Sequence, residues 1–182
     1  MRILFIGTVL FSKNILDEIV KSKNKIVGVI GGTKTKFNSD YCDLVKYSKF
    51  KKIDSIYAEN INSNKILKWV KKKKPDIIFC IGWSRLLKKQ ILNIAPKGVI
   101  GYHPSDLPKN RGRHPIIWSL ALGLKNIGSC FFYMDEAADT GRIISKKKIK
   151  IKKNFNSYLV YKKLIQVGKQ QIREIMLKIK NN

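Results

Sequence analysis

Short apolar runs alternate with amphipathic stretches along the first part of the chain. Arg2 to Gly7 and Lys25 to Ile30 have the length and composition of buried strands. A helix is expected between them from about Ser12 to Lys21, with Ser12 capping its first turn. The order strand, helix, strand predicts a right-handed parallel unit. We therefore expect an α/β fold: a single open, mostly parallel twisted sheet, Rossmann-like, with helices on both faces.

The rest of the chain continues this pattern without repeats or a linker. Gly31 to Lys52 is polar and is expected to be a loop with a short helix around Asp43 to Lys49. Further strands are expected at 76–82, 97–103, 128–134 and 142–151, and helices at 62–73, from about residue 114 or 115, and at 156–180. Asn62 or Ser63 is expected to cap the helix at 62–73. We expect one domain spanning residues 1–182.

The chain is strongly basic, with 38 Lys and Arg against 12 Asp and Glu and a formal net charge of +26. Because the lysines are spread along the chain, we favour a solvated surface over general attraction of anionic substrates, and that over dedicated nucleic-acid binding. The sequence shows neither an apolar run of membrane-spanning length nor a signal peptide, so a cytoplasmic protein with no membrane partner is expected. CxxC and HExxH patterns are absent, and we expect no metal site.

The chemistry-bearing residues concentrate between Val99 and Gly141. His103 stands at the end of an expected strand, and Asp139 lies on the loop after the next strand. If these strands are neighbours, the carboxylate can hold the imidazole and raise its pKa towards working pH, an arrangement suited to general acid–base catalysis. For the two residues taken alone, capping of a strand and of a turn is the more frequent explanation.

The wider motif changes that balance. The segment Tyr102-His103-Pro104-Ser105-Asp106-Leu107-Pro108, the Arg111-Gly112-Arg113 element with Pro115 and Trp118, and the later Met134-Asp135-Glu136 and Ala138-Asp139-Thr140-Gly141 resemble the core of the folate-dependent formyltransferases. That superfamily includes methionyl-tRNA formyltransferase, glycinamide ribonucleotide transformylase and the sugar N-formyltransferases. Three positions depart from its pattern: Gly101 replaces an Asn, Asp106 a Leu and Ala137 a Gly.

The resemblance implies a catalytic domain that moves a formyl group from the co-substrate 10-formyltetrahydrofolate to a primary amine, without a metal. His103 and Asp139 would be the catalytic residues. The pterin ring would lie between two loops formed by Trp83, Arg85, Leu86 and Leu87 and by Asp135, Glu136, Ala137 and Ala138. The sequence after the first strand, GTVLFS, lacks the GxGxxG spacing, so a dinucleotide cofactor is not expected.

The acceptor is expected to be the amine of a nucleotide-linked sugar, because the Arg-Gly-Arg element followed by Pro115 and Trp118 looks most like the sugar-nucleotide members. Ser105, Arg111 and Arg113 would then bind the substrate, although two further surface cations would explain the arginines as well. A homodimer is left open.

Three alternatives also remain open. One is phosphoribosylglycinamide formyltransferase, and a second is a methionyl-tRNA formyltransferase-like enzyme, which would carry a further carboxy-terminal domain not expected after Asn182. The third is a catalytically impaired folate- or nucleotide-binding protein. Gly101 supports the third, because it has no side chain to stabilise an oxyanion unless Asn110, His114 or an ordered water substitutes.

Overall fold

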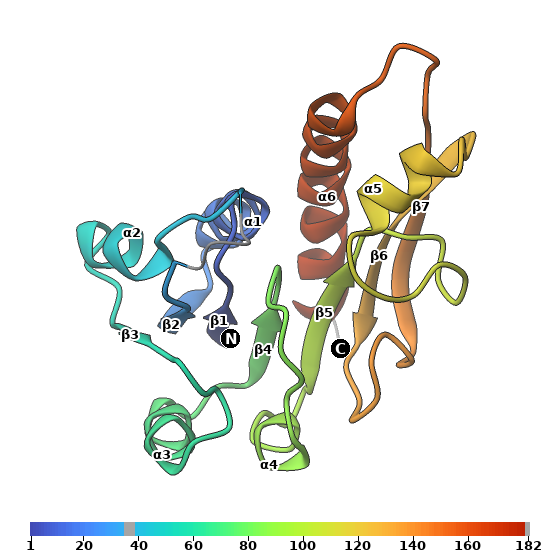
Figure 1. Ribbon diagram of the computed structural model, residues 1–182. Coiled ribbons are helices and arrows are strands. Elements are labelled where there is room, and N and C mark those ends of the chain that lie inside the picture. Colours follow the sequence, from blue (N-terminus) through green and yellow to red (C-terminus); the bar gives the residue numbers. More distant parts are fainter. Residues whose placement is uncertain (35–38, 181–182) are drawn as a thin grey trace.

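A single seven-stranded sheet runs through the computed structural model, which describes residues 1–34 and 39–180 (Figure 1). The strand order is β3-β2-β1-β4-β5-β6-β7. The strands are β1 (Arg2–Ile6), β2 (Lys25–Gly31), β3 (Ser55–Tyr57), β4 (Ile77–Cys80), β5 (Val99–His103), β6 (Asn126–Tyr133) and β7 (Ile143–Lys150). The first five pair in parallel, whereas β6 is antiparallel to both β5 and β7. The expected α/β fold with a mostly parallel open sheet is confirmed.

Helices cover both faces of the sheet because the strands are apolar on both sides. The helices are α1 (Leu10–Val20), α2 (Leu44–Phe50), α3 (Asn64–Lys73), α4 (Lys89–Leu92), α5 (Pro115–Ala121) and α6 (Ser157–Lys180). In β1, Ile3 and Phe5 belong to the core under α1 and α6, while Leu4 and Ile6 belong to the core under α3 and α4. This alternation follows from the period of two along a strand.

The structure differs from the expected elements mainly at helix starts and in two short elements. Strand β3 and helix α4 were not expected, and each is only three or four residues long. Helix α1 begins at Leu10, so Ser12 lies in its first turn, where its hydroxyl accepts a hydrogen bond from the N–H of Val9 at 3.3 Å, as expected of a capping residue. The same hydroxyl is fully buried and donates a 2.6 Å hydrogen bond to the carbonyl of Ile81. Ser63 rather than Asn62 caps α3.

The polar region at 31–52 contains the expected short helix, α2, which is capped by Asp43. Residues 35–38 of that region lie outside the described residues.

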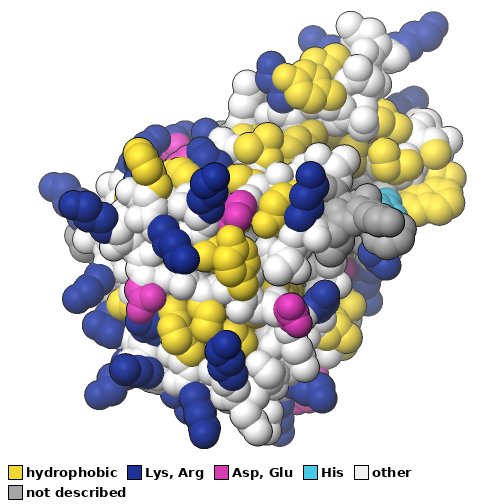
Figure 2. All heavy atoms as spheres, turned by 60° about the vertical axis from the view of Figure 1, so that its left-hand side comes forward, with side chains coloured by type: hydrophobic (Ala, Val, Ile, Leu, Met, Phe, Trp, Pro, Cys, Tyr) yellow, Lys and Arg dark blue, Asp and Glu magenta, His cyan; other side chains and the backbone are white. Residues whose placement is uncertain are grey.

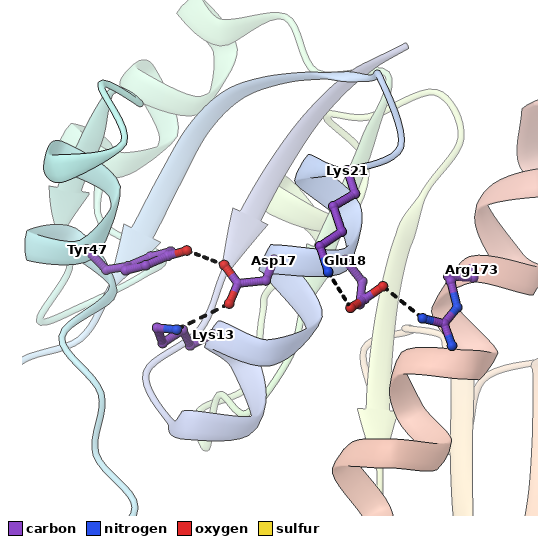
Figure 3. Close-up of polar contacts among 6 residues, drawn as sticks. All are labelled: Lys13, Asp17, Glu18, Lys21, Tyr47 and Arg173. Carbon is purple, nitrogen blue, oxygen red and sulfur yellow. Dashed lines mark hydrogen bonds and ion pairs between the residues drawn. The ribbon is translucent and has the colours of Figure 1, made fainter.

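Two consecutive acids on α1 tie that helix to its neighbours (Figure 3). Asp17 accepts a hydrogen bond from the hydroxyl of Tyr47 on α2, and Glu18 pairs with Arg173 of α6 and with Lys21, each at 3.1 Å. Glu18 is buried, and its two cations hold the pKa of its carboxyl below the ordinary value against the opposing effect of burial. These polar contacts fix α1, and with it the turn after β1, relative to α2 and α6.

The basic side chains are spread over the molecular face in Figure 2, where Lys and Arg alternate with apolar and neutral surface and acids are few. This distribution agrees with the solvated-surface interpretation of the high charge. Within the described part of the chain, no helix combines the length and apolar character needed to cross a bilayer.

Candidate active site

His103 and Asp139 lie together at the end of β5. The Nδ1 atom of His103 is 3.6 Å from Oδ2 of Asp139. His103 is only 8% exposed, and its Nε2 atom is buried without a hydrogen-bond partner among the described residues. A buried polar atom without a partner is costly unless a ligand supplies one. His103 thus has one ring nitrogen near an acid and the other without a partner among the described residues.

The loop that carries Asp139 reaches His103 by running back along β5. Because β6 is antiparallel to β5, its last residue, Tyr133, lies opposite Ile100 near the start of β5, while His103 lies opposite Cys130. The carboxyl ends of β5 and β6 thus lie at opposite ends of the strand pair, and Asp139 comes close to His103 only because the loop after β6 returns. Gly141 permits the return, because a Cβ there would lie 1.7 Å from the carbonyl oxygen of Tyr133.

The backbone of Asp139 is held in an uncommon conformation. Its φ is 58°, in the left-handed region that Asp tolerates better than most residues. Its carbonyl accepts a 3.1 Å hydrogen bond from Nε of Arg111. Residues in this region cluster at functional sites, where the surrounding structure holds them in place.

Burial lowers the pKa of His103 below its ordinary value of 6.5, and this effect exceeds the upward effects of the Asp139 carboxylate and of a backbone hydrogen bond with Asn110. The expectation of a raised pKa was therefore wrong in sign, since sequence reasoning considered the carboxylate but not the desolvation. At neutral pH His103 is neutral and can accept a proton.

Gly101 lies two residues before His103, on the same face of β5. A Cβ built at this position would be 2.8 Å from Cγ of Met134 and 3.1 Å from Cζ of Phe132. Apolar atoms thus border the position where the family pattern places an amide. Asn110 and His114, the expected substitutes, are both exposed and both have φ near 57°.

The loop after β4 is held by a residue that sequence reasoning read only as a helix cap. The side chain of Asn62 donates to the carbonyl of Leu86 at 3.0 Å and accepts from the N–H of Lys88 at 2.8 Å. The pattern of an Asn before a helix does not reveal such a long-range contact.

Of the expected pterin-binding residues in this loop, Arg85 and Leu86 are exposed, Trp83 is half-buried with an unpartnered Nε1, and Leu87 is buried in the core. Leu87 therefore offers its backbone rather than its side chain.

The second expected pterin loop is exposed from Asp135 to Ala138. Oδ1 of Asp135 accepts hydrogen bonds from the N–H of Ala137 at 3.1 Å and from the hydroxyl of Thr140 at 2.5 Å. The N–H of Ala137 is therefore engaged within the loop, which leaves the backbone of Glu136 and Ala138 as the more accessible part. Met134, at the start of this loop, packs against the same apolar cluster as Trp83.

The expected substrate-binding residues divide into one buried and two exposed. Ser105 is 1% exposed and donates to the carbonyl of Lys109 at 3.2 Å, so its hydroxyl is buried and engaged within its own loop. Arg111 and Arg113 are exposed and line a cavity of about 260 Å³ together with Trp118 and Leu122.

Metal-binding side chains do not gather in the part of the chain that the structure describes. Among residues 1–34 and 39–180, no three His, Cys, Asp or Glu side chains lie close enough to hold an ion.

Sequence relatives of this chain include methionyl-tRNA formyltransferases. That of Kosmotoga olearia is 32% identical over 98% of this chain and 59% of the relative, and that of Buchnera aphidicola is 30% identical over 100% of this chain and 59% of the relative. The chain thus spans about three fifths of the length of these curated relatives.

Solved structures share the fold at lower identity. Phosphoribosylglycinamide formyltransferase from Bacillus halodurans matches with a TM-score of 0.85 at 18% identity, covering 98% of this chain and 95% of that one. A sugar 3N-formyl transferase solved in the presence of dTDP and 5-N-formyl-THF matches with a TM-score of 0.78 at 22% identity, over 100% of this chain and 64% of that one. The family model described as formyl transferase matches residues 1–176, and the chain belongs to this family.

Proposed function

We propose that this protein transfers a formyl group from 10-formyltetrahydrofolate to a primary amine, and that the amine belongs to a nucleotide-linked amino sugar. The observation that supports the reaction most directly is the His103–Asp139 pair, with Nε2 of His103 buried and unpartnered. Family membership supports the same chemistry.

In this proposal the folate co-substrate supplies the formyl carbon that the amine attacks. The amine loses a proton as its nitrogen bonds to that carbon, and the neutral imidazole of His103 accepts it through Nε2. The carboxylate of Asp139 then stabilises the positive charge on the ring, as an acid does beside a catalytic histidine. The imidazole returns the proton to the departing folate nitrogen, so the pair ends the cycle in its starting protonation state.

The residues present fit a folate ligand. Leu86 is 57% exposed, and Trp83 and Met134 pack against the same apolar cluster, so both loops offer apolar surface and backbone groups to a ring. The exposed guanidinium of Arg85 can meet the carboxylates of a folate's glutamate. The proposed folate-binding residues are therefore Trp83, Arg85, Leu86, the backbone of Leu87, and the loop 135–138.

An anionic acceptor is supported by Arg111 and Arg113. Both line the cavity beside Trp118, and Arg111 also bonds the backbone of Asp139, so this cavity adjoins the catalytic pair. Two guanidinium groups can bind a diphosphate bidentately, and an indole offers a flat apolar surface to a base.

The N-terminus of α1 is another place where a phosphate could bind, but its N–H groups already bond to other parts of the chain. Helix N-termini bind phosphate through free N–H groups. At the start of α1, the N–H of Leu10 donates to the carbonyl of Asp40 at 2.8 Å and that of Phe11 to the hydroxyl of Tyr161 at 2.9 Å. The phosphates of the substrate are therefore better placed against Arg111 and Arg113.

A methionyl-tRNA acceptor is the second candidate, favoured by the sequence relatives and by the net charge of +26. Both candidates share the formyl transfer step and differ only in the acceptor.

The test is to incubate the purified protein with 10-formyltetrahydrofolate and separate acceptors, and to follow formylated products by mass spectrometry. The acceptors are a panel of amino-sugar nucleotides, glycinamide ribonucleotide and methionyl-tRNA. We expect transfer to an amino-sugar nucleotide. Transfer to the tRNA alone would select the second candidate, and folate binding without transfer to any acceptor would overturn the proposed reaction.

His103→Ala and Asp139→Asn should each lower the rate by about 100- to 10,000-fold, the usual contribution of general acid–base catalysis, while folate binding survives. His114→Ala removes the chain's other histidine, which is exposed, and tests separately whether that side chain substitutes for the missing oxyanion donor. Near-normal rates in either of the first two variants would refute the assigned roles.

A further inference from the structure

One departure from the family pattern makes contacts that the pattern residue could not make. Asp106, which stands where the pattern has Leu, pairs with two lysines of β7: its Oδ1 is 2.7 Å from Nζ of Lys146 and its Oδ2 is 3.4 Å from Nζ of Lys148. Lys146 is the larger of the influences that lower the pKa of the Asp106 carboxyl below its ordinary value, so the carboxyl is charged at neutral pH.

Lys146 also bonds the backbone of the same loop. Its Nζ donates to the carbonyl of Leu107 at 2.9 Å, so one ammonium group holds two adjacent residues. Lys148 makes only the longer contact, and its side chain is 63% exposed. The two lysines thus differ: Lys146 contacts both the Asp106 carboxylate and the Leu107 carbonyl, whereas Lys148 makes only one longer contact with Asp106.

The loop from 104 to 110 is already close to β6 at its beginning. The thiol of Cys130 donates to the carbonyl of Ser105 at 3.1 Å, and a Cβ on Gly128 would lie 2.1 Å from that oxygen. Leu107 is buried against Cys130 and Phe132. Lys146 therefore adds a polar anchor to a segment whose start rests on the β6 backbone.

The far end of this loop contacts both members of the catalytic pair. The backbone of Asn110 lies close enough to the ring of His103 to raise its pKa, and Nε of the next residue, Arg111, donates to the backbone carbonyl of Asp139. A shift of the loop would therefore disturb the surroundings of the His103 ring and the backbone of Asp139 together. Misplacement of catalytic groups by about 1 Å can cost roughly 100-fold in rate.

We propose that Asp106 and Lys146 form a clamp that holds the loop 104–110 and through it positions the His103–Asp139 pair, with Lys146 as the principal positioning residue. The clamp rests on the proposed formyl transfer for its effect on turnover, but its effect on His103 does not depend on any reaction. Lys146 and Asp106 need not touch a substrate for this role.

The test is Lys146→Met, which removes the charge and keeps a long side chain, with Lys148→Met as the matched control. We expect Lys146→Met to lower kcat by about 10- to 100-fold, with KM for the folate changed less than threefold. Lys148→Met should stay within about twofold of the wild type. Lys146→Arg should recover most of the lost rate, because its guanidinium can again reach the carboxylate.

A purely structural role is separated from positioning by NMR titration of the His103 ring in the same variants. Loss of the clamp should change the pKa or the chemical shifts of His103 in Lys146→Met but not in Lys148→Met. Identical His103 titration and kcat in Lys146→Met and the wild type would overturn the proposal, as would equal losses in the two lysine variants. If the wild type transfers no formyl group, the proposed function fails, and the titration alone still decides whether the clamp exists.

Discussion

Gly101 offers the sharpest test of how the oxyanion is stabilised. We expect Gly101→Asn to raise kcat, because the new amide would point from the same face of β5 as His103 and add a donor to the developing negative charge. One such donor is typically worth about 100- to 1000-fold in rate. The new Cβ would lie 2.8 Å from Cγ and 3.1 Å from Sδ of Met134, so that side chain must move. Methionine is flexible, and overpacking costs about 1–3 kcal/mol of stability.

Gly101→Ala is the control for this prediction. Its Cβ presses on Met134 and Phe132 in the same way but brings no donor, so the ratio of kcat between the Asn and Ala variants isolates the amide. Both variants are to be assayed under single-turnover conditions with saturating folate, and their thermal unfolding is to be followed by circular dichroism. If the Asn variant is no faster than the Ala variant, the wild-type site does not lack a donor at this position and the reasoning fails.

Two further predictions concern titrating groups. Glu18→Gln should lower the free energy of unfolding at pH 7 by about 1 kcal/mol, or the midpoint of thermal unfolding by roughly 2–4 °C, because it removes the ion pairs with Lys21 and Arg173. The loss is small because both cations are largely exposed. Since the pKa of Glu18 is lowered, its contribution is present above about 4.5 and is lost as the pH falls through the folded-state value. The difference in stability between the two proteins should therefore shrink as the pH is lowered from 4.5, and a difference that does not shrink would contradict this. By NMR, His103 should titrate below 6.5 in the wild type and lower still in Asp139→Asn, because that carboxylate raises its pKa; a rise in the variant would count against the pairing.

Most of the fold followed from the sequence because strand and helix periodicity report burial directly. Strong apolar runs such as Arg2 to Gly7 and the stripe of the last helix gave the order of elements, and their parallel pairing followed from the intervening helices. The three residues of β3 carry no such signal, since their place depends on pairing with Val29 to Gly31 of β2. The second bond of the Ser12 hydroxyl, to Ile81, was not predictable because it joins residues that are 69 positions apart.

The candidate site was predictable in its members and less so in its geometry. A histidine before Pro104 and an acid before Gly141 are visible as motif residues, and they do lie together. The sign of the shift in the pKa of His103 was not predictable, because it depends on how deeply β5 is covered. The contacts of Lys146 were also hidden, since a single lysine in a chain with 38 basic residues carries no signal of its own.

The antiparallel pairing of β5 and β6 makes the site depend on close packing at Gly101. The loop after β6 starts beside the beginning of β5, where the N–H of Met134 donates to the carbonyl of Val99 at 2.8 Å. It must then travel along β5 to bring Asp139 to within 3.6 Å of His103. Met134 lies over Gly101 at the start of this path. Gly101 has no side chain to act as an oxyanion donor, and for the same reason it leaves room for the loop. A side chain at position 101 therefore presses on the path of Asp139 whatever its chemistry, which is why alanine rather than glycine is the proper reference for asparagine.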